Sequence, residues 1–106
     1  MMNKYGKPDA NHADIMRALK RCGVLCHDTK MVGGGFPDIV AWNPRSGIMA
    51  LLEVKDGDKP PSKQKLTKAE ERFHLDWDGA PVFIVRDVYE ALTVVGVDVV
   101  DASPPF

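Results

Sequence analysis

A predicted β-hairpin is the feature that most constrains how this chain of 106 residues can fold. Two apolar runs, at residues 39–42 and 48–55, flank the sequence Asn-Pro-Arg-Ser-Gly at residues 43–47. Short runs rich in β-branched and aromatic residues are typical of buried strands, and a cluster of Asn, Pro and Gly is typical of a turn. We therefore predict two neighbouring antiparallel strands.

Three charged residues fall at one end of this hairpin. Side chains alternate between the faces of a strand, so Glu53 and Lys55 share one face. Antiparallel pairing then brings Asp38, at the start of the first strand, beside them. Carboxylates are ligands for hard divalent cations, and a lysine supplies positive charge beside a reacting phosphate. The alternative interpretation is a surface salt bridge, which contributes little stability.

The remaining pattern predicts one α/β domain. We expect helices at residues 11–21, 68–77 and 87–92, and strands at 24–26, 81–86 and 94–100 in addition to the hairpin. The order α-β-β-β-α-β-α indicates a mixed central β-sheet flanked by helices. We place this single domain at residues 9–100, after a loose lead-in at residues 1–8 and before a tail at residues 101–106.

Composition excludes several classes of protein. The formal net charge of −1 argues against a broadly basic nucleic-acid coat, although lysines gather between residues 55 and 72. No apolar run approaches the roughly 20 residues that span a bilayer, and we expect no membrane partner. Two cysteines and no signal-peptide pattern are typical of a reduced, cytoplasmic protein. Cys22 and Cys26 could bind a metal only with His12 or His27 nearby.

Four short sequence motifs carry a resemblance to a known family. They are DANHADI at residues 9–15, VGGGFPD at 32–38, LEVKDG at 52–57 and PPSKQKLT at 60–67. In this order they resemble the VRR-Nuc family of the PD-(D/E)XK nuclease superfamily, over about residues 9–92. The chain is similar to the stand-alone, phage-type members of that family.

The resemblance implies a restriction-endonuclease-like core that binds Mg²⁺ or Mn²⁺. Asp38 and Glu53 would be metal ligands, with the Val54 carbonyl as a third. Lys55 would orient or activate the attacking water and stabilise charge in the transition state. The implied chemistry is metal-assisted hydrolysis of a phosphodiester bond.

Two positions depart from the family pattern in the first helix. The family usually carries a glutamate there that reaches the metal, and we assign this catalytic, metal-binding role to Asp14. The alternative for Asp14 is an exposed polar residue. Stand-alone relatives often have glutamine where this chain has His12, which either contacts DNA beside the metal ligands or is solvated.

Glu70 departs from the family pattern in the second predicted helix, where relatives often have glutamine. It either lies near the metal ligands or belongs to a capping box with Thr67. For DNA contacts we name three lysines of the basic segment and two glycines that allow close approach of the backbone: Lys59, Lys63, Lys65, Gly34 and Gly35. The alternative for the lysines is a solvated charge run.

The leading functional interpretation is a metal-dependent DNA endonuclease in a bacterial cell or phage-infected host. The resemblance implies cleavage of four-way (Holliday) junctions by a homodimer, because two symmetric cuts need two sites related by a two-fold axis. The alternatives are a nuclease for flaps or nicks, a non-catalytic DNA-binding module that keeps the fold, and a small interaction protein with a chance motif. The intact acidic and basic set favours the enzyme, and stabilisation by a divalent cation would argue against a chance motif.

Overall fold

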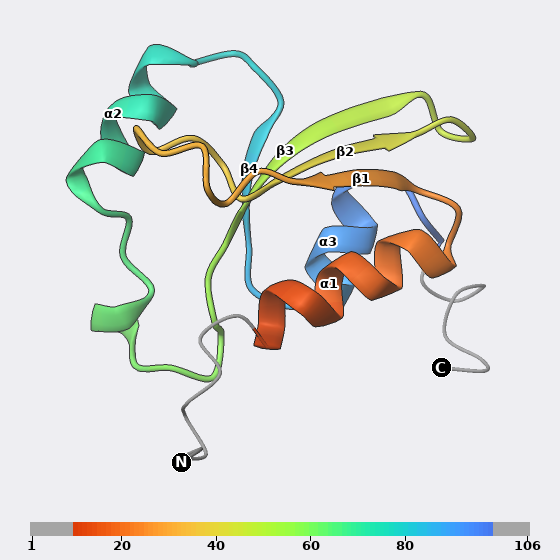
Figure 1. Cartoon of the computed structure of the whole chain (residues 1–106), viewed down its shortest axis with the longest axis horizontal. Helices are drawn as coiled ribbons and strands as arrows, with labels where there is room; N and C mark the ends of the chain where they lie inside the picture. The colour runs from red at the N-terminus through yellow and green to blue at the C-terminus, as the bar shows by residue number, and fades with distance from the viewer. Residues whose placement is uncertain (1–9, 99–106) are drawn as a thin grey trace.

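The fold is a mixed β-sheet with helices, in a computed structural model that describes residues 10–98 (Figure 1). Four strands lie in the order β1-β2-β3-β4, which confirms the predicted α/β class. The elements in chain order are α1 (Ala10–Arg21), β1 (Leu25–Asp28), β2 (Ile39–Asn43), β3 (Ile48–Val54), the 3-10 turn η1 (Pro61–Lys63), α2 (Lys68–Asp76), β4 (Val82–Val85) and α3 (Val88–Val94).

Strand pairing confirms the predicted hairpin. β2 pairs with β3 in antiparallel register, with Ile39 opposite Leu52 and Asn43 opposite Ile48. β1 extends the sheet antiparallel to β2, and β4 adds to β3 in parallel, with Glu53 opposite Ile84. The start of β2 and the end of β3 therefore meet at one end of the sheet.

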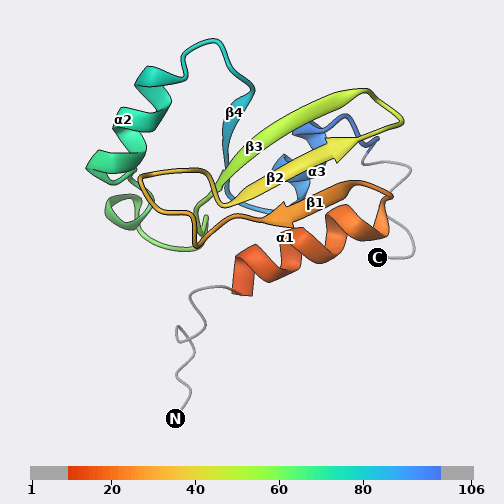
Figure 2. The ribbon, with the colours of Figure 1, turned by 45° about the horizontal axis from the view of Figure 1, so that its top comes forward.

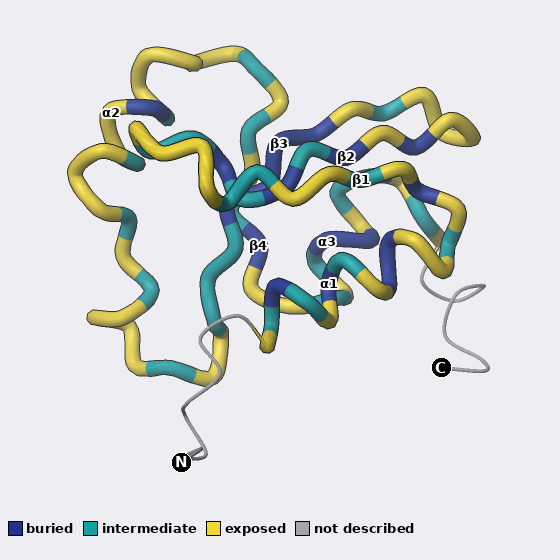
Figure 3. The backbone as a smooth tube through the Cα atoms, viewed as in Figure 1, coloured by how far each residue is buried: buried dark blue, intermediate teal, exposed yellow. Residues whose placement is uncertain are grey.

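α1 and α3 lie side by side on one face of the sheet (Figures 1 and 2). The core forms between these helices and the strands, and its fully buried members include Ile15, Leu19, Ile39, Leu52 and Val85. Figure 3 shows that burial is concentrated there, whereas the segment from the end of β3 through η1 to α2 is mostly exposed. In α1 the core residues recur at helical spacing, which is why this amphipathic segment forms a surface helix.

α2 lies at the end of the sheet where β2 begins and β3 ends, beside the loop that joins β1 to β2 (Figure 2). Three aromatic rings attach this loop to the helix. The Phe36 ring meets Phe73 edge-on with centroids 5.4 Å apart, and Phe73 stacks on Trp77 at 4.7 Å. These contacts fix α2 over the charged end of the hairpin.

Some predicted boundaries are wrong. No strand forms at residues 94–98, because α3 continues through Val94 and ends with Val95 as its buried C-cap. Residues 99 and 100 of that predicted strand, the lead-in at 1–8 and the tail at 101–106 lie outside the described residues. The first strand is Leu25–Asp28 rather than 24–26. Within residues 10–98, no helix is both long and apolar enough to cross a membrane.

Candidate metal and nuclease site

Pairing at the end of the hairpin places Asp38 against the last residues of β3. The Asp38 main-chain N–H donates to the carbonyl of Leu52 at 2.8 Å. Its carboxylate, through Oδ2, accepts a hydrogen bond from the Val54 N–H at 2.8 Å. The predicted approach of Asp38 to the Glu53-Val54-Lys55 segment is therefore confirmed as geometry.

Glu53 is the buried acid of this site. Only 1% of the residue is exposed, and its Oε1 has no hydrogen-bond partner. Burial raises the pKa of Glu53 to about 9, and the neighbouring carboxyl groups of Asp38 and Glu70 add to the increase. An ionised carboxylate in such surroundings is costly unless a positive charge compensates it.

Lys55 supplies one positive charge but pairs mainly with Glu70. Its Nζ lies 2.8 Å from Glu70 Oε1 and 3.8 Å from Glu53 Oε2. The Lys55 and Glu70 side chains are both largely buried, at 13% and 17% exposure. The distance of 2.8 Å is typical of a charge-assisted hydrogen bond and the distance of 3.8 Å is not, so Glu70 is the direct partner of Lys55.

Glu70 fulfils both roles that the sequence left open. Its Oε1 accepts from the Thr67 N–H at 2.8 Å, while its own N–H donates to Thr67 Oγ1 at 3.2 Å. This is the predicted capping box of α2. Burial alone would raise the pKa of Glu70, but hydrogen bonds from Lys55 and the Thr67 N–H outweigh it and hold the pKa below its ordinary value.

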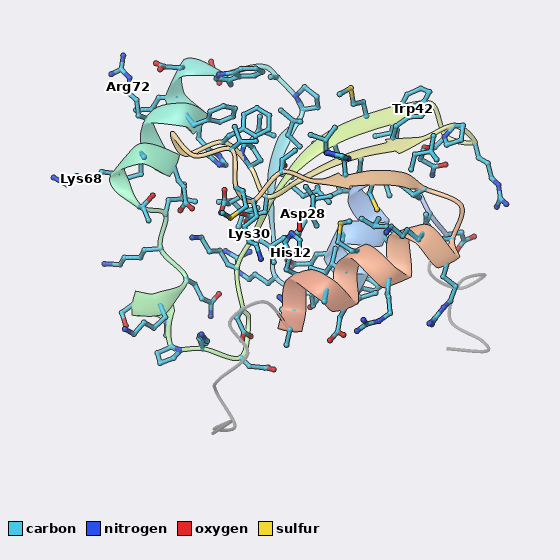
Figure 4. The ribbon with its side chains drawn as sticks, in the orientation of Figure 1. His12, Asp28, Lys30, Trp42, Lys68 and Arg72 are labelled. Carbon is cyan, nitrogen blue, oxygen red and sulfur yellow. The ribbon has the colours of Figure 1, made fainter. Side chains whose placement is uncertain are left out.

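His12 lies in the buried start of α1 and is not solvated. Its Nε2 is 3.5 Å from Asp28 Oδ1 and 3.4 Å from the Asp38 carbonyl oxygen. Figure 4 shows His12 and Asp28 side by side. His12 thus connects α1 to the end of β1 and to the main chain of a proposed metal ligand.

The prediction that the Asp14 side chain lies at the metal site is wrong. The Asp14 side chain is 58% exposed and pairs with Arg17 on the outer surface of α1. It lines a shallow depression of about 300 Å³ with residues of α1 and with Val88 of α3. The buried stripe of α1 runs through His12, Ile15 and Leu19, and Asp14 lies off that stripe.

Asn11 is a residue of this site that sequence reasoning missed. Its Nδ2 donates to the Lys55 carbonyl and to the Arg86 carbonyl, both at 2.9 Å. One side chain of α1 thereby ties together the ends of β3 and β4. The only sequence signal was its position one residue before His12, on the side of α1 that the stripe brings toward the strands.

The two glycines named for DNA contacts have different surroundings. Both Gly34 and Gly35 have positive φ, of 65° and 79°. A Cβ on Gly35 would lie 2.2 Å from the Ala69 carbonyl oxygen, whereas a Cβ on Gly34 would have no neighbour within 4 Å. Gly35 therefore serves the packing of the loop on α2, and only Gly34 is open to a ligand.

The basic residues lie on the segment that leaves the site after Lys55 and returns to it at Glu70. Lys63 and Lys65 are exposed, and Lys59 is half-buried. Gln64 braces this segment, because it donates to the Lys59 carbonyl at 2.6 Å and accepts from Arg86 Nε at 3.0 Å. Lys68 and Arg72 of α2 point outward (Figure 4). The segment thus presents cations beside the site.

Few carboxylates are available at this site to bind a divalent cation. In the described part of the chain, no group of three or more His, Cys, Asp or Glu side chains is arranged to hold a metal ion. A cation would therefore depend on Asp38 and Glu53, completed by the Val54 carbonyl and water. Glu53 Oε1 has no hydrogen-bond partner, and burial, followed by the neighbouring carboxyl groups, raises the pKa of Glu53; a bound cation would offset both of these costs.

Comparisons with known proteins give a family match and a similar solved structure. The sequence matches the VRR-NUC domain family over residues 7–76. A solved structure described as "VRR_NUC domain" superposes with a TM-score of 0.56 at 25% sequence identity, covering 80% of this chain and 92% of that one. No curated protein gives a match.

The family match implies a nuclease-type domain, and with it DNA as the partner. The chain belongs to the VRR-NUC family.

Proposed function

We propose that this domain is a Mg²⁺- or Mn²⁺-dependent endodeoxyribonuclease that cleaves four-way DNA junctions as a homodimer. The observation that carries the proposal is the convergence of Asp38, Glu53 and Lys55 at the paired ends of β2 and β3. Two acids, of which Glu53 is buried and Asp38 half-buried, beside a lysine are what phosphodiester hydrolysis by a bound cation requires.

Each group has a role that follows from its position. Asp38 and Glu53 hold the cation, with the Val54 carbonyl. When bound, the cation supplies positive charge at the scissile phosphate and makes a water molecule more acidic. Lys55 Nζ donates toward the attacking water or a phosphate oxygen, where negative charge develops in the transition state. The attacking oxygen bonds to phosphorus, the bond to the leaving oxygen breaks, and a proton passes to that oxygen.

Two further parts of the molecule support DNA as the substrate. The exposed Lys63 and Lys65 lie on the chain segment that follows the site, where they can contact phosphates. Gly34 offers open main chain on the loop before Asp38. Asn11 holds the main chain at Lys55, and His12 lies against the main-chain carbonyl of Asp38.

The preference for junctions rests on the family resemblance and on symmetry. In the proposed homodimer a two-fold axis would relate two identical sites, as paired cuts in a four-way junction require. A domain of this size offers few surfaces for reading a base sequence, which favours selection by DNA structure.

The test is cleavage of a labelled four-way junction, with flap and uninterrupted duplex as comparisons, in Mg²⁺ and in Mn²⁺. Wild type should give paired symmetric nicks, and Asp38→Ala and Lys55→Ala should lose at least about a hundredfold in rate. Glu71→Ala and Lys20→Ala change the same charges at exposed positions and serve as matched controls.

Each other outcome separates the alternatives. Cleavage of flaps or nicked duplex in place of junctions would keep the chemistry and reject junction selectivity. Binding of junctions without cleavage in either metal would instead identify a non-catalytic DNA-binding module. A monomer at the concentrations that cleave junctions would reject the homodimer.

A further inference from the structure

Lys55 has two carboxylates within reach and has formed a direct bond with only one of them. Its Nζ is 2.8 Å from Glu70 and 3.8 Å from Glu53. The longer distance exceeds that of a hydrogen bond. Glu53 Oε1, although fully buried, has no partner at all. The lysine therefore leaves the buried acid without a direct positive partner.

Glu70 is held where it can keep the lysine in this position. The capping box fixes it from both ends, because its side chain accepts from Thr67 and its N–H donates to the Thr67 hydroxyl. α2 is in turn fixed by the Phe73 contacts with Phe36 and Trp77. A side chain anchored in this way loses little further entropy when it binds the ammonium group.

A lysine and a divalent cation compete for the same carboxylate oxygens. Lys55 follows the last residue of β3, two residues after Glu53 in the chain, so its effective concentration at that acid is high. If nothing else bound the ammonium group, it would pair with Glu53. A cation would then have to displace it before it could bind.

We propose that Glu70 is a positioning residue that draws Lys55 away from Glu53 and so keeps the Glu53 carboxylate open to a divalent cation. The inference rests on the proposed function, because the cation is that of the nuclease site. It assigns Glu70 no direct bond to the cation. The same contact leaves Lys55 beside the site, where the proposed chemistry needs its charge.

The experiment measures Mn²⁺ and Mg²⁺ affinity without DNA, by calorimetry and by the rise in Tm on adding the cation. Glu70→Ala should weaken affinity by roughly tenfold or more, because the freed ammonium group of Lys55 then competes with the cation for Glu53, and changes around a metal ligand have effects of this size. Glu70→Gln should keep near wild-type affinity, because its amide oxygen accepts the same two hydrogen bonds. The double variant Lys55→Ala/Glu70→Ala should recover the affinity of Lys55→Ala, because no lysine remains to compete.

Matched variants separate this role from helix capping. Thr67→Ala removes the capping hydroxyl but leaves the Lys55–Glu70 contact, so it should lower Tm without changing cation affinity. Glu71→Ala makes the same charge change on the next, exposed residue and should behave as wild type. Should Glu70→Ala not fold, Glu70→Met replaces it, since methionine is a strong helix former of similar length that cannot bind an ammonium group.

Three results would overturn the inference, and they are distinguishable. If Glu70→Ala and Glu70→Met both leave cation affinity unchanged, Glu70 has no such role and the proposed function stands. If the double variant binds as weakly as Glu70→Ala, Glu70 is itself a ligand. If wild type binds neither cation, the inference and the metal dependence of the proposed function fall together.

Discussion

Near the end of β3, the neighbouring residues Leu52 and Glu53 are equally buried on opposite faces of the strand, in chemically opposite surroundings. Leu52 is 0% exposed and faces the apolar core under α1 and α3, while its neighbour Glu53 is 1% exposed and faces Asp38 and Glu70. Burial stabilises the first side chain and penalises the charged form of the second. Two side chains with similar exposure can therefore contribute to stability with opposite signs. The face on which burial disfavours the charged side chain is also the face that carries the candidate site.

The two faces also differ in how they are covered. α1 and α3 close the Leu52 face along its length, whereas α2 covers only the end of the other face (Figures 1 and 2). Toward the hairpin turn, Trp42 and Met49 of the Glu53 face are 41% and 49% exposed. The face that holds the candidate site is therefore open on one side to a large ligand.

Leu52→Ala should have the largest effect on stability. Removing a fully buried leucine from the core should lower the free energy of unfolding by about 2 to 5 kcal/mol. Urea denaturation measures the loss. A loss below about 1 kcal/mol would show that the apolar face is not the main source of stability.

Gly35→Ala tests the cover of the polar face. A Cβ would collide with the Ala69 carbonyl at 2.2 Å, at a positive φ, so we expect a loss of roughly 2 to 3 kcal/mol. Gly34→Ala is the matched control, since it has the same kind of φ but open space, and it should lose only about 1 kcal/mol. Equal losses would mean that the loop does not depend on its contact with α2.

Glu53→Gln should act in the opposite direction to Leu52→Ala. In EDTA at pH 8 the folded state of wild type must keep a proton on Glu53 that the unfolded state releases, whereas glutamine folds without this cost and its amide can donate to Asp38 or Glu70, so we expect stabilisation on the order of 1 to 2 kcal/mol. Cleavage and cation binding should be lost in the same variant. A large destabilisation would reject the view that the ionised acid is a cost to the fold.

Stability should also fall with rising pH when no divalent cation is present. The folded pKa of Glu53, about 9, lies above its model-peptide value of 4.5, so the folded state retains a proton that the unfolded state releases. The stabilisation is complete below pH 4.5 and is lost as pH rises toward 9, with a slope of at most about 1.4 kcal/mol per pH unit.

The pH profile has two built-in controls. Glu70 has a lowered pKa, so its contribution is lost only as pH falls below its ordinary range, in a different window. Glu53→Gln should flatten the slope between pH 5 and 8, as should saturating Mn²⁺ in wild type. Thermal unfolding in matched buffers measures all three, and an unchanged slope in the variant would assign it to another group.

Asp14→Asn should have the smallest effect. Its carboxylate is exposed and paired with Arg17 on the outside of α1, so the free energy of unfolding should change by less than about 0.5 kcal/mol. Cation affinity and cleavage rate should equal those of wild type, as measured beside Asp38→Ala. A large loss of cleavage would restore Asp14 to the site.

The sequence by itself determined the hairpin and the meeting of Asp38 with Glu53 and Lys55. These residues are close in the chain, and a strong turn leaves an antiparallel pair few registers that bury its apolar face. The capping box was readable for the same reason, because Thr67 and Glu70 are three residues apart. Local geometry sufficed in each case.

Only the tertiary structure decided which side of α1 faces the site and where Glu70 points. Asn11 reaches Lys55 and Arg86 across 44 and 75 residues of sequence, and no local pattern encodes such a contact. Each residue of a helix turns by about 100°, so His12 and Asp14 lie on nearly opposite sides of α1, and the side that faces the sheet decides which of them reaches the site. Helix orientation follows from packing of the whole core, and packing is a property of the folded chain rather than of any segment.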